Sequence, residues 1–289
     1  MPTKPYEWMV EYTPQKEWID RRGLLVWLAE VASGLGGGLY LVSSYFDSLI
    51  GMFISWIVII VLKGGFHFAY LGHPLRFWRM GLKPSTSWLA RGFIFMTLFI
   101  IFGALQLTFS HLLPGTAWEI LFKVLAGMMA FLLTINTGFV LSSVHAVPLW
   151  NSAILPILFL LCGILDGLAV VILIGLFSGN VHIQTAEVGI RLFIIMNALL
   201  ITLYLWSAVH AGQTGKRSVF VLIKGQLAPV LWIGVVSCGI VIPLIISISS
   251  FYIGKTSAIF LVMAVVCEMI GVLSLKYSLL KGGIYHPLI

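Results

Sequence analysis

The sequence predicts an all-α integral membrane protein. Of its 289 residues, 60% are hydrophobic and only 9% are charged, and the mean hydropathy is +1.06. Soluble globular domains carry charge on about a quarter of their residues. The apolar segments are continuous and about 20 residues or longer, which suits helices that cross a hydrocarbon core of about 30 Å. Strands of a lipid-facing barrel would instead alternate apolar and polar residues.

Eight apolar segments are long enough to cross a bilayer, and short connections join them. In sequence order we predict membrane-spanning helices over residues 23–46, 49–71, 89–113, 117–142, 149–178, 186–211, 227–252 and 256–280.

Residues 1–22 form a predicted N-terminal interfacial segment before the first span. The charged residues of this segment include Glu7, Glu11, Glu17, Asp20, Arg21 and Arg22. It lacks the basic start, the short apolar run and the small-residue cleavage site of a signal peptide. We therefore expect the first span to stay in the mature protein.

An even number of spans puts both termini on one face of the membrane. That face collects most of the loop cations, namely Lys4, Lys16, Arg21, Arg22, Arg76, Arg79, Lys83, Lys216, Arg217, Lys224 and Lys281, whereas the opposite loops offer Lys255. The positive-inside rule then predicts that both termini are cytoplasmic. The net charge of +7 therefore bears on membrane topology and on binding partners. Nothing in the sequence suggests nucleic acid as a partner.

Two glycine pairs and three cysteines lie within predicted spans. Gly34 with Gly38, and Gly163 with Gly167, have the four-residue spacing that lets helix backbones approach closely in lipid. The cysteines form no CxxC motif and no cysteine–histidine spacing suited to zinc or an iron–sulfur cluster. The sequence therefore predicts close helix packing and no metal ligands in this protein.

Several ionisable residues lie inside the apolar spans, where burial is costly and usually marks a polar pathway. The candidate proton pathway consists of Glu30, Lys63, Lys123, Asp166, Arg191, Glu268 and Lys276. Two interpretations stay open at this point. The charges can form internal ion pairs that fix the helix bundle, or they can conduct protons.

Residues 71–92 contain the most specific motif, LGHPLRFWRM followed by KPSTSWLARG. This stretch resembles the polysulfide reductase membrane-subunit family, NrfD/PsrC, although His73 replaces an arginine that is common there. Three further segments agree with the resemblance: GLGGGLYL from Gly34, the Thr137-Gly138 and PLWN elements around the fifth span, and the GIYHP tail from Gly283. The resemblance covers essentially the whole sequence.

The resemblance implies a haem-free membrane anchor subunit of a respiratory oxidoreductase in a prokaryotic plasma (inner) membrane. Its eight helices would form two four-helix bundles, over residues 23–146 and 147–289, with a quinone site in the first. The exchangeable cofactor would be menaquinone or ubiquinone, with no haem or iron–sulfur cluster in this subunit. Electrons would pass to or from a ferredoxin-like iron–sulfur subunit that serves a molybdopterin-type catalytic subunit.

A quinone site needs hydrogen-bond partners, a proton route and apolar or aromatic walls. Glu30 lies one to two turns inside the membrane, with Trp27 almost one turn before it. Lys63, His67 and Tyr70 follow spacings of four and three, so they share one helical stripe. We predict Trp27, Glu30, His67, Arg76 and Asn136 as quinone-binding residues.

Arg76 belongs to the motif that resembles the family, which is the reason to include it among these residues. Asn136 stands where members of the family often have a tyrosine. An amide can hydrogen-bond a quinone but lacks the acidity of a phenol. His73, Arg79 and His145 are predicted near the same interface, where they would belong to the quinone site or to the partner interface.

Two other functional classes remain as alternatives. A di-haem cytochrome b-type anchor needs facing histidine pairs, and His67, His145 and His210 do not give two obvious pairs at their predicted depths. A secondary transporter can also use buried charges, although the sequence shows no clear inverted repeat.

Overall fold

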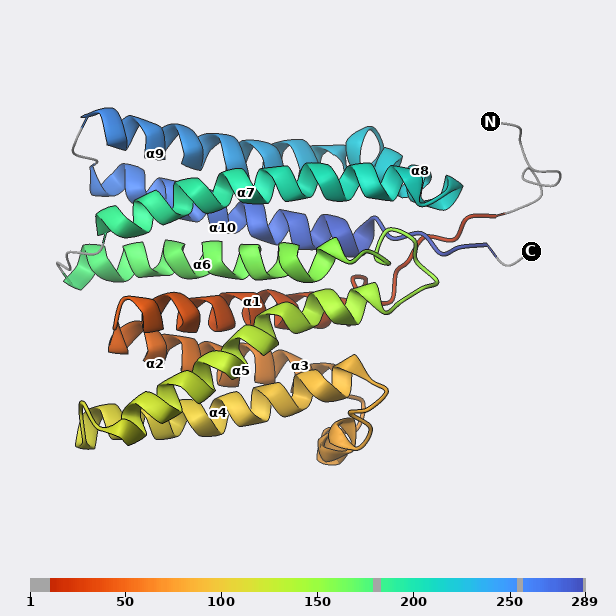
Figure 1. Ribbon diagram of the computed structural model, residues 1–289. Coiled ribbons are helices and arrows are strands. Elements are labelled where there is room, and N and C mark those ends of the chain that lie inside the picture. Colours follow the sequence, from red (N-terminus) through yellow and green to blue (C-terminus); the bar gives the residue numbers. More distant parts are fainter. Residues whose placement is uncertain (1–10, 179–182, 254–256, 288–289) are drawn as a thin grey trace.

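A computed structural model describes residues 11–178, 183–253 and 257–287, and these parts of the protein are predominantly helical (Figure 1). Within them, eight helical segments are long and apolar enough to cross a membrane: Gly23–Tyr45, Leu49–Tyr70, Trp88–Leu112, Ala117–Ser142, Ile154–Ser178, Ile183–His210, Val230–Tyr252 and Ala258–Lys281. The predicted all-α membrane fold with eight spans is confirmed, and the protein is a multi-pass integral membrane protein.

Most spans are single α-helices, namely α1 (Gly23–Tyr45), α4 (Trp88–Leu112), α5 (Ala117–Ser142), α6 (Ile154–Ser178), α7 (Ile183–His210) and α10 (Ala258–Lys281). Two spans contain a π-helical stretch. The second span runs through α2 (Leu49–Ile57), the π-helix η2 (Val58–Gly64) and α3 (Gly65–Tyr70), and the seventh through the π-helix η4 (Val230–Val241) and α9 (Ile242–Ile253).

Polar residues fix where several helices begin. The side chains of Ser48, Ser87 and Thr116 accept hydrogen bonds from backbone amides in the first turns of α2, α4 and α5. The fifth span begins at Ile154, five residues later than predicted, because residues 149–153 form a turn. Pro229, directly before the π-helix of the seventh span, has helical φ and ψ, as suits the first turn of a helix, where a backbone N–H is not needed.

Two predicted loops contain short helices that lie outside the eight spans. Residues Pro74–Gly81 form the 3₁₀-helix η3, and Gln213–Ile223 form α8. Residues 13–15 of the N-terminal stretch pair with residues 283–285, through bonds from Gln15 N to Gly283 O (2.8 Å) and from Tyr285 N to Thr13 O (3.0 Å). The first and last described segments therefore lie together.

Helix α1 occupies the centre of the fold. It packs against α5, α6 and the helices of the second span, while α4 packs on α5 and α10 packs on η4 and α6. In Figure 1 the first four spans lie on one side of the α1–α6 contact and the last four on the other. Because α1 and α5 both contact α6, the halves share a continuous interface, and the predicted grouping into two four-helix bundles stays a prediction.

The predicted glycine packing is confirmed at the α1–α6 contact. A Cβ atom on Gly38 would overlap the carbonyl group of Gly163, and one on Gly167 would crowd the backbone of Gly38. Only glycine allows the two backbones to lie this close in lipid. The contact therefore depends on the absence of side chains at these positions.

The outer faces of the spans expose large apolar side chains, for example Leu199 (61%), Ile233 (64%) and Phe260 (53%). In water such an extensive apolar surface would be unfavourable, whereas hydrocarbon is its natural solvent. The exposure is therefore that of helices that face lipid.

We expect Gly38→Ala to lower the free energy of unfolding by about 3 kcal/mol, because the added methyl group overpacks the α1–α6 contact. The measurement is the thermal unfolding of the purified protein in mild detergent. Gly127→Ala on α5 is the matched control, since an added Cβ there meets nothing within 4 Å. Equal melting temperatures for the two variants would contradict the proposed role of the contact.

Candidate functional site

A cavity of about 430 Å³ lies beside α1, at the end of the second span and beneath η3. Its walls are mostly apolar and aromatic, with Phe68 from α3, Phe77 from η3, and Phe93 and Met96 from α4. Glu30, Lys63, His67 and Asn136 provide its main polar groups. The structure thus brings together three of the five predicted quinone-binding residues, and adds Lys63 to them.

Glu30 is the centre of the polar wall. One carboxylate oxygen, Oε2, accepts a hydrogen bond from the Thr137 hydroxyl of α5 and lies 3.9 Å from Lys63 Nζ. The other, Oε1, lies 4.0 Å from His67 Nε2. Hydrogen bonding and opposite charge both offset the cost of burying this carboxylate.

Lys63 reaches Glu30 from the π-helical stretch η2 and is only 4% exposed. Single π-helical turns inside α-helices often occur at functional sites, because the wider turn changes which side chains share a face. Lys63 and His67 lie one turn apart and both face Glu30. The stripe that was predicted on the second span therefore faces α1 through Lys63 and His67.

Asn136 enters the cavity from α5. Its side chain is 6% exposed, and its Oδ1 atom is buried without a hydrogen-bond partner among the described residues. The amide nitrogen lies where a Cβ atom on Gly92 would be, so glycine in α4 gives the amide its space. Asn136 consequently keeps an unused hydrogen-bond acceptor at the cavity wall.

Trp27 lies outside the lining of this cavity. Its ring packs edge-on against Tyr277 of α10, with ring centroids 5.7 Å apart, and its indole N–H is buried without a partner among the described residues. Trp27 instead borders a void of about 10 Å³ that Glu30 and Lys276 also line. It therefore lies between Glu30 and the second half of the protein.

The four remaining candidates of the quinone site or partner interface are exposed and do not line the cavity. His73, Arg76 and Arg79 belong to η3 or its start, and His145 lies in the connection between α5 and α6. The guanidinium of Arg79 lies 5.5 Å from the centre of the Trp78 ring. Their positions suit contact with lipid headgroups or with another subunit.

A second group of buried charges lies between α6 and α10. Lys276 Nζ is 3.9 Å from Asp166 Oδ2, and both residues are at most 3% exposed. Lys276 Nζ also occupies the space that a Cβ atom on Gly34 would need. Glu268 is 1% exposed, and neither of its carboxylate oxygens has a hydrogen-bond partner among the described residues.

Arg191 lies further along the same half. It donates hydrogen bonds to Ser247 Oγ (3.1 Å) and Ser247 O (2.9 Å). Ser247, Glu187 and Glu268 line a void of about 20 Å³. Of the predicted pathway residues, Glu30 and Lys63 thus border the large cavity, and Asp166, Glu268 and Lys276 are buried on α6 and α10. Arg191 contacts Ser247, which lies at the same void as Glu268.

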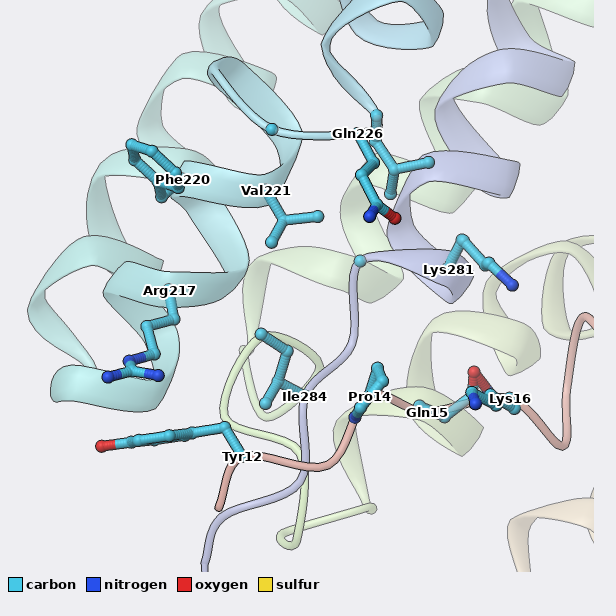
Figure 2. A pocket seen from close by; sticks show the side chains of 13 residues that line it. Tyr12, Pro14, Gln15, Lys16, Arg217, Phe220, Val221, Gln226, Lys281 and Ile284 are labelled. Carbon is cyan, nitrogen blue, oxygen red and sulfur yellow. The ribbon is translucent and has the colours of Figure 1, made fainter. Parts of the chain in front are cut away.

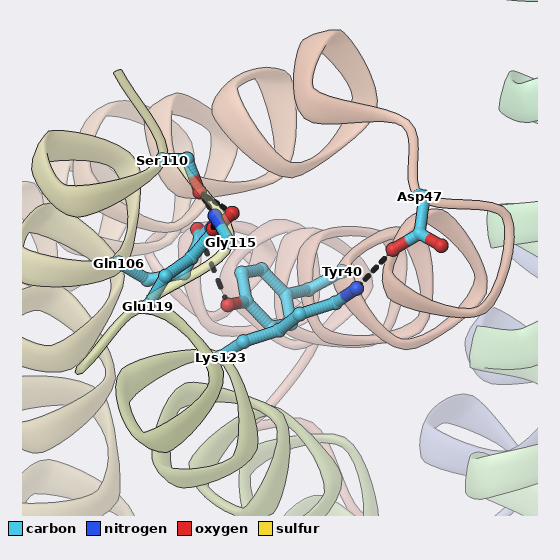
Figure 3. Close-up of polar contacts among 7 residues, drawn as sticks. All are labelled: Tyr40, Asp47, Gln106, Ser110, Gly115, Glu119 and Lys123. Carbon is cyan, nitrogen blue, oxygen red and sulfur yellow. Dashed lines mark hydrogen bonds and ion pairs between the residues drawn. The ribbon is translucent and has the colours of Figure 1, made fainter. Parts of the chain in front are cut away.

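Lys123 is the exception, because it pairs with Asp47 in the connection between α1 and α2 (Figure 3). A separate polar network lies near it: the Tyr40 hydroxyl donates to Gln106 Oε1 (3.4 Å) and Gln106 Nε2 to Ser110 Oγ (2.8 Å). Ser110 in turn donates to Glu119 Oε1 (2.6 Å). Lys123 is therefore not in contact with the groups around Glu30.

The sequence reasoning did not single out Thr137 or Gln106 as polar contacts. Thr137 is part of the Thr-Gly motif, but neighbouring residues on a helix point in different directions, so the position of Asn136 did not show that Thr137 contacts α1. Gln106 is a lone amide within an apolar span. Among the described residues, no group of three or more histidine, cysteine or acidic side chains is suited to hold a metal ion.

Comparison with known proteins gives a family. The family model described as "Polysulphide reductase, NrfD" matches residues 43–287. The C subunit of polysulfide reductase from Wolinella succinogenes is 29% identical over 153 residues, which are 51% of this protein and 48% of the relative. The NrfD homolog of Haemophilus influenzae is 30% identical over 167 residues, 56% of this protein and 52% of the relative.

NrfD of Escherichia coli is 27% identical over 243 residues, which cover 74% of this protein and 76% of the relative. The matches to the first two relatives span only about half of their lengths. The family match, in contrast, extends from the end of the first span to the C-terminal tail. On this basis the protein belongs to the polysulphide reductase NrfD family.

Proposed function

We propose that this protein is the haem-free, quinone-reactive membrane anchor of a respiratory oxidoreductase. The observation that carries the proposal is the cavity of about 430 Å³ with aromatic walls and the polar group of Glu30, Lys63 and His67. Ligand cavities of this size, with apolar walls and a few polar groups, are typical of small-molecule sites. One relative is named as a subunit of polysulfide reductase. This similarity favours a role for the protein as one subunit of a multisubunit reductase.

Menaquinone or ubiquinone would bind in this cavity and supply two-electron, two-proton redox chemistry. His67 and Asn136 would hydrogen-bond the ligand, and the aromatic side chains would exclude water. Glu30 would hold or release the proton, since Thr137 and Lys63 keep its carboxylate in place. Electrons would be exchanged with a ferredoxin-like iron–sulfur subunit that serves a molybdopterin-type catalytic subunit.

The buried charges of the second half favour proton transfer as a further part of this function. Glu30 and Lys276 line the same small void, and Lys276 pairs with Asp166. The oxygens of Glu268 have no partner among the described residues. An arrangement that served only to fix the bundle would satisfy such costly groups more fully.

We expect Glu30→Gln to reduce quinol-linked electron transfer about 100-fold, because the amide cannot accept a proton. The native complex is isolated in mild detergent, its subunits are identified by mass spectrometry, and menaquinol-analogue oxidation is measured. Glu11→Gln is the matched control on the exposed N-terminal stretch. An iron–sulfur partner and a selective loss of turnover support the proposal.

Isolation without such a partner and without quinone turnover would contradict this function and favour a transporter. A haem absorption band in the purified protein would favour the cytochrome b-type alternative instead.

We expect Asp166→Asn to abolish proton movement while electron transfer stays within about twofold of the wild-type rate, because Asp166 lies outside the 430 Å³ cavity. The complex is reconstituted into vesicles that contain a pH-sensitive dye, and quinol oxidation is followed in parallel. Unchanged proton movement in the variant would limit Asp166 to a structural ion pair with Lys276.

We propose that the protein lies in a prokaryotic plasma membrane with both termini in the cytoplasm. In protease-protection experiments on sealed inverted and right-side-out vesicles, tags at both termini should be cleaved only in the inverted ones. Cleavage in right-side-out vesicles would reverse the orientation and put the cavity near the outer face.

A further inference from the structure

A second, larger cavity of about 630 Å³ lies on the face where the first and last described segments meet. The N-terminal stretch forms one wall, α8 and the loop after it form another, and the end of α10 with the following tail forms the third (Figure 2). Its lining shares no residue with the 430 Å³ cavity. The proposed quinone chemistry therefore makes no use of it.

The walls of this cavity are fixed by backbone pairing. Gln15 and Thr13 bond to the tail at Gly283 and Tyr285, and the Arg217 guanidinium of α8 stacks 3.8 Å from the centre of the Tyr12 ring. A Cβ atom on Gly282 would crowd Leu222 of α8. The three walls thus hold one another in place without a ligand.

The cavity is positively charged. Among the described residues, its lining includes Lys16, Arg217 and Lys281 and no carboxylate. Lys281 pairs with Asp20, which lies outside the lining, whereas Lys16 and Arg217 form no ion pair within the described part of the protein. Two such cations beside a cavity attract an anion.

Gln15 adds an unsatisfied amide to this wall. Its side chain is 0% exposed, and neither Nε2 nor Oε1 has a hydrogen-bond partner among the described residues. Burying an amide without a partner is costly. A ligand with both an acceptor oxygen and a hydroxyl donor would satisfy it. In Figure 2 the amide of Gln226 also points into the space between α8 and the tail.

The third property is the depth of the cavity in the membrane. Helix α8 lies between the end of α7 and the start of η4, and Trp232 Nε1 donates to the carbonyl of Ile223 at its end (3.0 Å). Trp206 and Trp232 are 63% and 50% exposed, as is typical of residues at the headgroup level. Phe220 on α8 is 60% exposed and contributes an apolar wall together with Val221 and Leu227.

We infer that this cavity binds the phosphodiester headgroup of an anionic phospholipid. Arg217 and Lys16 attract the phosphate charge from opposite ends of the cavity (Figure 2), Gln15 bonds a phosphate oxygen and a headgroup hydroxyl, and the apolar wall contacts the start of an acyl tail. Basic pockets between helices at the cytoplasmic surface commonly bind such lipids. A free phosphate ion would share the polar contacts but leave the apolar wall uncovered.

The test is native mass spectrometry of the full-length protein, with any co-purifying subunits, titrated with phosphatidylglycerol, with phosphatidylcholine or with inorganic phosphate. We expect selective retention of phosphatidylglycerol. The double variant Lys16→Gln/Arg217→Gln should weaken its binding about 25-fold, since each cation contributes about fivefold. Lys224→Gln is the matched control, because Lys224 is a cation of the same face that does not line the cavity.

A second variant separates binding from folding. In phosphatidylcholine alone, Gln15→Leu should melt at or above the wild-type temperature, because an apolar side chain removes the buried unpaired amide. It should lose the increase in melting temperature that phosphatidylglycerol gives the wild type. Equal retention of both lipids, equal binding by the double variant, or displacement of the lipid by inorganic phosphate would each overturn the inference.

Discussion

The close backbone contact between α1 and α6 is the constraint on which the other features depend. At Gly38 and Gly163 the two helices approach until no side chain fits between them, and in lipid this kind of van der Waals contact replaces the hydrophobic effect as the main source of association. The same approach lets Lys276 of α10 reach the α1 backbone at Gly34. Because Glu30 precedes Gly34 by one helical turn, the packing contact also brings the two groups of buried charge close together.

The two charge groups are stabilised to different degrees. Glu30 has a hydroxyl donor and two nitrogen bases around it, so its carboxylate is held in one place. Lys276 and Asp166 are paired at 3.9 Å, yet Lys276 Nζ and Asp166 Oδ2 make no hydrogen bond among the described residues. Fixed groups suit ligand binding, because orientation determines affinity. Loosely held groups suit proton transfer, because each group must exchange its hydrogen-bond partners as the proton moves.

The sequence predicted the spans well, since each needs about 20 apolar residues and little else. The spacing of Lys63 and His67 also predicted their common face. Trp27 was placed with the cavity residues because it lies three residues before Glu30, but α1 has neighbours on several sides and the indole faces α10. The Lys276–Asp166 pair joins different helices, so spacing within one helix could not predict it. Helix α8 was not predicted from the sequence because it is short and rich in polar residues.

The helix η3 lines the 430 Å³ cavity with one side and is exposed on the other. Phe77 and Met80 line the cavity, whereas Leu75 is 92% exposed and Trp78 is 53% exposed. The hydrogen bonds of a 3₁₀-helix have poorer geometry than those of an α-helix, and runs of more than three or four residues are uncommon. The stability of the eight-residue η3 therefore depends on what covers its two faces. A subunit bound to Leu75 and Trp78 would therefore press on a wall of the proposed quinone cavity. One short element of the most specific stretch of the sequence thus carries both exposed residues and residues that line the cavity.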